Sequence, residues 1–156
     1  MLKGKNIVVG VCGGIAAYKA VDVVSKLKKL NANVDVIMTR SACEFVTPLT
    51  FQSISKNPVS TNMFQEPKNW DIAHISLASK ADAFLIVPAT ANIIGKIAYG
   101  IADDMLSTTV MAASCPIIIA PAMNNKMYEN TVVQSNIKKL ADMGYVFVEP
   151  STGSLA

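Results

Sequence analysis

The chain of 156 residues contains only one histidine and three cysteines. Cys12, Cys43 and Cys115 lie far apart and form no C-x-x-C pair, which argues against a disulfide framework and a structural zinc site. Asp103 and Asp104 are adjacent acids, but no histidine or further carboxylate pattern joins them, so we assign no metal. These features predict a reduced, cytoplasmic protein.

Long apolar runs and strong charge are also missing. No apolar stretch reaches the roughly 18 residues that a membrane-spanning helix needs, and no signal-peptide cleavage pattern follows the N-terminus. Charged residues make up 16% of the chain, and the net charge is +3. The densest basic run, residues 26–29, has no interleaved aromatic residues of the kind that stack on single-stranded nucleic acid. We therefore expect neither a membrane nor a nucleic acid as a partner.

Hydrophobic residues make up 51% of the chain, enough for one domain over residues 1–156 with a sizeable core. The apolar pattern predicts short strands at residues 7–11, 34–38, 83–87, 117–120 and 145–148. Helical periodicity predicts helices at residues 15–30, 41–55 with a break near Pro48, and 130–143 with Gly144 as the C-cap. This alternation predicts a doubly wound α/β domain whose parallel sheet is covered on both faces. Ligands of such sheets bind beyond the carboxyl ends of the strands.

The first predicted strand ends in the glycine-rich loop Cys-Gly-Gly-Ile-Ala, residues 12–16. Glycines at a strand-to-helix junction let backbone amides approach a phosphate, and the helix N-terminus adds a favourable partial charge. The spacing matches neither G-x-G-x-x-G nor a triphosphate-binding loop. The phosphate of a mononucleotide is the better candidate, and a purely structural turn is the alternative.

Two further loops carry polar residues after predicted strands. Thr39 and Ser41 are placed to donate hydrogen bonds to the same ligand or to cap the next helix. Residues 88–92, Pro-Ala-Thr-Ala-Asn, are small enough to leave room for a flat ring, with Thr90 and Asn92 as polar anchors. The alternative for Thr90 is an N-cap.

Two candidates for contacts with a substrate lie elsewhere. Asn124, within Pro-Ala-Met-Asn-Asn-Lys-Met-Tyr at residues 121–128, can donate to a substrate carboxylate and accept from its neighbours. If Asp71 is an N-cap, His74 lies in the first turn of a helix, where the positive end of the helix dipole disfavours imidazolium. A neutral imidazole suits a general base. A structural histidine beside apolar residues is the alternative.

Taken together, these loops resemble the homo-oligomeric flavin-containing cysteine decarboxylases over essentially the whole chain. Four elements occur in the family's order, namely Gly-Gly-Ile-Ala-Ala-Tyr-Lys at 13–19, His-Ile at 74–75, residues 88–92 and residues 121–128. The last two correspond to the family's P-A-S-A-N-T and P-x-M-N-x-x-M-W motifs, with substitutions at Thr90, Ile93 and Tyr128. The resemblance implies a flavodoxin-like or Rossmann-like three-layer flavoprotein.

The resemblance also implies a cofactor and roles for individual residues. FMN is expected to contact Gly13, Gly14, Ile15, Thr39, Ser41, Pro88, Ala89, Thr90, Ala91, Asn92, Ser107 and Ala122. His74 matches the family's base, and Asn124, with Met127 nearby, matches its substrate-binding residues. In the family's reaction the base takes a proton while hydride passes to the flavin, and the resulting thioaldehyde loses CO2 to give an enethiol.

Within the family, the Leu-Ala ending favours the branch that converts 4'-phosphopantothenoylcysteine towards 4'-phosphopantetheine in coenzyme A synthesis. That branch continues with L-A-C-G, whose cysteine donates a proton when the enethiol is reduced, whereas this chain stops at Leu155-Ala156. We expect a piece of a longer protein, often one with a fused ligase domain, that oxidises its substrate but stalls before reduction. The resemblance further implies trimers or dodecamers in which neighbouring copies share sites.

Other functions remain as alternatives. Peptidyl-cysteine decarboxylases of lantibiotic synthesis stop at the enethiol and need no reducing cysteine. Flavin prenyltransferases share the glycine loop but lack this histidine and the M-N-x-x-M motif. A non-catalytic flavin-binding regulator of the halotolerance type carries long charged tails, and a flavodoxin-like electron carrier is usually acidic.

Overall fold

A five-stranded parallel sheet forms the centre of the protein. The computed structural model describes residues 1–64 and 73–150. The strands are β1 (Asn6–Val11), β2 (Asn33–Met38), β3 (Ala83–Ala89), β4 (Ile117–Pro121) and β5 (Val146–Phe147). Their order in the sheet is β2-β1-β3-β4-β5, so the direction of winding reverses between β1 and β3. The predicted doubly wound α/β class is confirmed.

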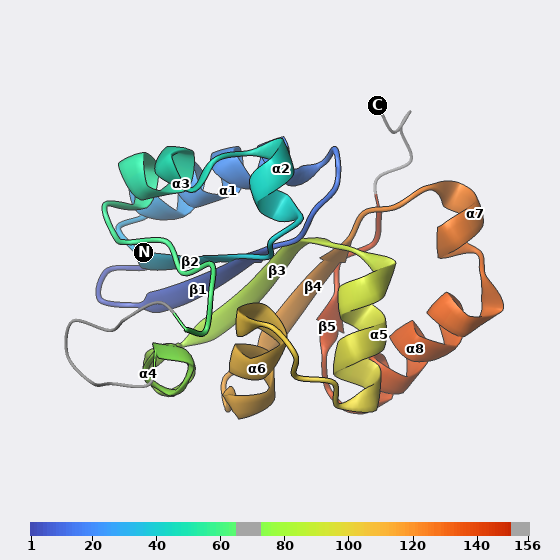
Figure 1. The fold of residues 1–156 in the computed structure, drawn as a ribbon. Coiled ribbons are helices and arrows are strands. Elements are labelled where there is room, and N and C mark those ends of the chain that lie inside the picture. The colour runs from blue at the N-terminus through green and yellow to red at the C-terminus, as the bar shows by residue number, and fades with distance from the viewer. Residues whose placement is uncertain (65–72, 151–156) are drawn as a thin grey trace.

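Helices lie on both faces of this sheet (Figure 1). One face carries α1 (Ala17–Lys29), α2 (Ala42–Phe45) and α3 (Pro48–Ser55), and the other carries α4 (Ala73–Lys80), α5 (Ala91–Tyr99), α6 (Met105–Ala112) and α8 (Thr131–Asp142). The short helix α7 (Asn125–Tyr128) follows the carboxyl end of β4. The sheet thus forms the middle layer of three.

Proline and glycine explain most of the element boundaries. The helix predicted at residues 41–55 is two helices, because Pro48 starts α3 at a position where its missing N–H costs nothing. β3 runs through Pro88 to Ala89, beyond its predicted end, but its pairing with β4 shifts register between Ile86 and Ala89. Gly144, with φ of +99°, follows the end of α8 as predicted. The last strand, β5, is only two residues long.

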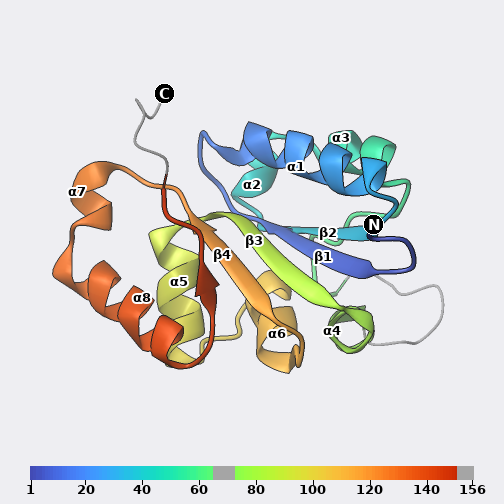
Figure 2. The same cartoon turned by 180° about the vertical axis from the view of Figure 1, so that it is seen from behind.

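Two apolar cores flank the sheet, and they are unequal. Phe84 and Ile86 of β3 belong to the larger core, which they share with α5, α6 and α8, whereas Val9 packs with α1 and α3 on the other side. On this second side no described helix covers β4, and its Ile118 and Ala120 stay half-buried (Figure 2). The expectation of cover on both faces is therefore wrong at β4.

No helix within residues 1–64 and 73–150 is both long and apolar enough to cross a membrane. The same residues contain no group of three or more histidine, cysteine, aspartate or glutamate side chains that could hold a metal ion.

Candidate functional site at the carboxyl end of the sheet

The loop between β1 and α1 presents a row of backbone donors. The N–H of Ala17 donates to the carbonyl of Gly14 at 2.9 Å, which marks the start of the helix. The N–H groups of residues 13–16 have no acceptor among the residues that the structure describes. Unpaired amides at the start of a 13-residue helix suit the phosphate of a mononucleotide. The donor set therefore fits the expected FMN phosphate.

Gly13 brings a second loop to this one. A Cβ added to Gly13 would lie 2.4 Å from the Cβ of Ser41 and 2.7 Å from its carbonyl carbon, so only glycine allows the approach. Thr39 accepts a hydrogen bond from the N–H of Ala42 at 3.1 Å, which leaves its hydroxyl hydrogen available as a donor. Capping and ligand binding, the two roles predicted for Thr39, are thus compatible. Ser41 is exposed and makes no capping bond.

Hydrogen bonds tie the segments after β1 and β4 to the carboxyl end of β3. The N–H of Cys12 donates to the carbonyl of Pro88 at 3.2 Å, and the N–H of Ala122 donates to that of Ala89 at 3.0 Å. Thr90 caps α5, because its hydroxyl oxygen accepts a hydrogen bond from the N–H of Ile93 in the first turn at 3.2 Å. The predicted FMN-binding segments at 13–15, 39–41, 88–92 and 122 therefore meet at one edge of the sheet.

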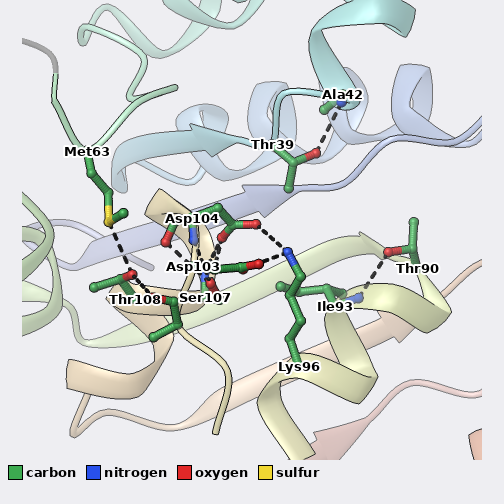
Figure 3. A network of polar contacts seen from close by, with 11 residues as sticks. Thr39, Ala42, Met63, Thr90, Ile93, Lys96, Asp103, Asp104, Ser107 and Thr108 are labelled. Carbon is green, nitrogen blue, oxygen red and sulfur yellow. Dashed lines mark hydrogen bonds and ion pairs between the residues drawn. The ribbon is translucent and has the colours of Figure 1, made fainter.

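Ser107 lies in the first turn of α6, next to these loops (Figure 3). It is buried, and both its N–H and its hydroxyl donate to Oδ1 of Asp104 at 2.7 Å, forming a capping box. Because this hydroxyl hydrogen is already engaged, contact between Ser107 and FMN stays a prediction.

Charged groups lie within electrostatic reach of Cys12, the first residue of the glycine loop. Burial would lower the pKa of the Lys96 ammonium, but hydrogen bonds and charge from Asp103 and Asp104 outweigh it and raise that pKa. Burial would raise the pKa of Asp104, yet hydrogen bonds from Ser107 and Lys96 hold it below its usual value. Burial raises the pKa of Cys12 to about 12, so this thiol stays protonated. Lys96 could not be found from the sequence, because a lysine within a helix has no distinctive pattern.

A cavity of about 810 Å³ opens at the same edge, on the side of the sheet where β4 is uncovered. Its lining includes the predicted residues Pro88 and Ala122. It also includes Lys19 and Tyr128, which belong to the recognised motifs but received no predicted role, and residues 148–150. The contribution of residues 148–150 has no local sequence signal, because only the fold brings them beside β4.

Asn124 has a fixed orientation beside this cavity. Its Oδ1 accepts a hydrogen bond from the N–H of Lys126 at 2.9 Å and caps α7. The Nδ2 amide group of the exposed side chain has no partner among the described residues and is the part left to donate. Met123 and Asn125 line the cavity on either side, while Asn124 itself does not. Met127 is exposed.

His74 is remote from Asn124 within one chain. It is the second residue of α4 and is half-buried, whereas its predicted N-cap, Asp71, lies outside the described residues. Helix α4 packs against α6 at one end of the molecule, and α7 lies at the other end (Figures 1 and 2). A single copy of the chain does not bring the predicted base and the predicted carboxylate-binding residue together.

The winding of the sheet reverses between β1 and β3, and backbone N–H donors and small residues gather at that point. This arrangement is typical of a doubly wound α/β protein that binds a phosphorylated, flat ligand. The model of the Flavoprotein family matches residues 1–156, and the chain belongs to this family. The predicted family is thereby confirmed.

Related proteins match the chain over nearly its whole length. The chain is 54% identical to the coenzyme A biosynthesis bifunctional protein CoaBC of Bacillus subtilis over 156 residues, which are 100% of the chain but 38% of that protein. It is 46% identical to a probable phosphopantothenoylcysteine decarboxylase of Streptococcus mutans, covering 97% of the chain and 86% of that protein. The chain thus spans well under half of its bifunctional relative and most of a shorter one.

Solved structures have the same fold. The FMN-dependent cysteine decarboxylase SpaF superimposes with a TM-score of 0.92 at 35% identity, covering 98% of this chain and 88% of that one. A PPC decarboxylase variant complexed with pantothenoylaminoethenethiol superimposes with a TM-score of 0.83 at 26% identity, covering 97% of this chain and 85% of that one.

Proposed function

We propose that this chain is an FMN-dependent decarboxylase that acts on 4'-phosphopantothenoylcysteine on the way to 4'-phosphopantetheine in coenzyme A synthesis. The observation that carries the proposal is the meeting of the loops after β1, β2 and β3 at the carboxyl edge of the sheet, with four backbone donors unpaired among the described residues. The names of the Streptococcus mutans relative and of the PPC decarboxylase structure support the choice of substrate.

The glycine loop and Thr39 hold the phosphate of FMN, and residues 88–92 and Ala122 lie along its ring. When bound, FMN supplies the electron acceptor for oxidation of the substrate's cysteine. His74 takes a proton from the substrate, and the Nδ2 group of Asn124 donates to the substrate carboxylate, which it holds in place until CO2 leaves. The cavity beside β4 gives the substrate room.

Neighbouring copies complete the site in this proposal. His74 and Asn124 lie at opposite ends of one chain, and β4 keeps a half-buried apolar face. A homo-oligomer, either a trimer or a dodecamer assembled from trimers, brings His74 of one copy to Asn124 of another. In a longer parent protein the rest of the chain carries the ligase that makes the substrate, as the name and length of the bifunctional relative suggest.

The proposal has a direct test. Purified protein should bind FMN with the visible spectrum of a flavoprotein, and anaerobic mixing with phosphopantothenoylcysteine should bleach that spectrum and release CO2. A peptide ending in cysteine, used in place of this substrate, should do neither. Failure to bind FMN would refute the cofactor, and bleaching by the peptide alone would refute the substrate.

Sharing of the site between copies has its own test. As pure proteins, the His74→Asn and Asn124→Asp variants should each bleach the flavin far more slowly than the wild type. Coexpressed, they should form mixed oligomers with about one quarter of the wild-type rate, because random pairing leaves that fraction of sites with both residues intact. Mixed oligomers that stay as slow as the pure variants would contradict a shared site.

A further inference from the structure

Lys96 forms an ion-pair cluster with two carboxylates. Its Nζ lies 2.8 Å from Oδ1 of Asp103 and 3.1 Å from Oδ2 of Asp104. Only 17% of the Lys96 side chain is exposed, so water screens these contacts less than it screens a surface pair. With all three groups ionised, the cluster has a net charge of −1.

The cluster fixes the start of α6 next to the flavin loops. Oδ1 of Asp104 caps the helix, and its Oδ2 is left for Lys96. In the first turn of α6, Leu106 packs so closely on Gly10 of β1 that a Cβ added to Gly10 would lie 2.4 Å from Cδ1 of Leu106. Figure 3 shows the cluster in the same region as Thr39 and Thr90, which belong to two of the segments that FMN is expected to contact.

The charges of the cluster also affect the pKa of Cys12, the first residue of the glycine loop. Both Asp104 and Lys96 influence the ionisation of the buried thiol of Cys12 through their charges. A group that affects Cys12 in this way lies within electrostatic reach of a ligand bound over the same loop.

We infer that Lys96 is a positioning residue that anchors α6 at the flavin site through Asp104 and limits the negative charge beneath the flavin. This inference rests on the proposed binding of FMN at this edge of the sheet. Reduction adds electrons to the flavin, so nearby negative charge disfavours the reduced form. Lys96 therefore keeps the flavin easier to reduce, which is what the oxidation of a substrate thiol requires.

Two variants separate this role from a purely structural one. Lys96→Met changes the net charge of the cluster to −2, and Asp103→Asn changes it to 0, although both remove the ion pair between Lys96 and Asp103. Asp103 does not cap α6, and its side chain is 60% exposed, so its replacement disturbs the fold little. The midpoint potential of bound FMN should fall in Lys96→Met and rise in Asp103→Asn.

The size of the shift follows from Coulomb's law. The ratio of the dissociation constants of reduced and oxidised FMN should change by roughly threefold to fifteenfold, as for a unit charge about 10 Å away. Lys96→Arg should stay close to the wild type. Lys138→Met is the matched control, because Lys138 forms an exposed pair with Asp142 on α8 at 2.6 Å and loses the same charge. It should leave the ratio unchanged.

The outcomes are distinct. Opposite shifts in Lys96→Met and Asp103→Asn support the inference, and shifts of the same sign, or none, overturn it. If Lys96→Met does not fold, Asp103→Asn alone decides, because an unchanged or lowered potential in that variant contradicts the charge argument. Wild-type protein that does not bind FMN would instead refute the proposed function.

Discussion

In the proposed function Asn124 binds the substrate carboxylate, and its replacement by aspartate should separate this role from folding. The Oδ1 of Asn124 caps α7 by accepting from the N–H of Lys126 at 2.9 Å. Aspartate caps helices about as well as asparagine, so the variant should keep its melting temperature within about 2 °C. The Nδ2 donor is replaced by a charged oxygen, which repels a carboxylate instead of binding it. The substitution therefore removes one function of this side chain and keeps the other.

The expected loss in turnover is large. A hydrogen bond to a charged group contributes about 1.5–3 kcal/mol, and each 1.4 kcal/mol corresponds to about tenfold in kcat/KM. Loss of this bond alone lowers kcat/KM by roughly 10- to 150-fold, and charge repulsion adds to it. The rate of flavin bleaching by phosphopantothenoylcysteine measures this effect, while the FMN spectrum and affinity should stay unchanged.

Asn130 provides a matched control. It caps α8 in the same way, by accepting from the N–H of Val132 at 2.9 Å, and it is exposed outside the cavity. Asn130→Asp should therefore bleach at the wild-type rate. The reasoning is refuted if Asn124→Asp bleaches as fast as the wild type, or if both aspartate variants lose activity equally.

Two further predictions concern stability. Gly13→Ala should lower the free energy of unfolding by about 1–3 kcal/mol, because the new Cβ collides with Ser41. Gly14→Ala, whose Cβ would meet no atom within 4 Å, should change it by less than about 0.5 kcal/mol. Urea unfolding compares the two variants, and equal stability would contradict the close packing at Gly13. The lowered pKa of Asp104 stabilises the fold above the carboxyl's usual pKa, and this contribution is lost as pH falls through the lower folded value. Asp104→Asn should thus lower the free energy of unfolding by about 1–2 kcal/mol at pH 7. This difference in stability from the wild type should shrink as the pH falls, and a difference that stays constant in acid would contradict the assignment.

Much of the fold could be predicted because its signals are local. Pro48, Gly144 and the apolar run at residues 117–120 each report on their own neighbourhood, and the structure places boundaries close to them. Which helices pack on each face of the sheet could not be predicted in the same way. An apolar strand indicates burial on both faces but does not say what buries them, and at β4 one face has no described helix over it.

The candidate site shows the same division. Gly13 and Thr39 follow strands and Pro88 lies near the carboxyl end of one, and the rule for parallel sheets is enough to bring them together. Lys96 could not be predicted, because its role depends on two carboxylates that approach it only after α5 and α6 have packed. The remote position of His74 was equally hidden, since order along the chain does not reveal which end of the sheet a helix occupies.

The separation of His74 from Asn124 bears on how this domain controls its chemistry. The loops expected to bind FMN are closely connected, because Gly13 packs on Ser41 and the segments after β1 and β4 donate backbone hydrogen bonds to the end of β3. The predicted base lies on α4, which packs against α6. Because Lys96 pairs with Asp104 at the start of α6, the helix that contacts α4 also begins close to the loops that FMN is expected to contact. In the proposed function, assembly of copies is the step that completes the site, and an isolated chain should bind FMN without turning over substrate.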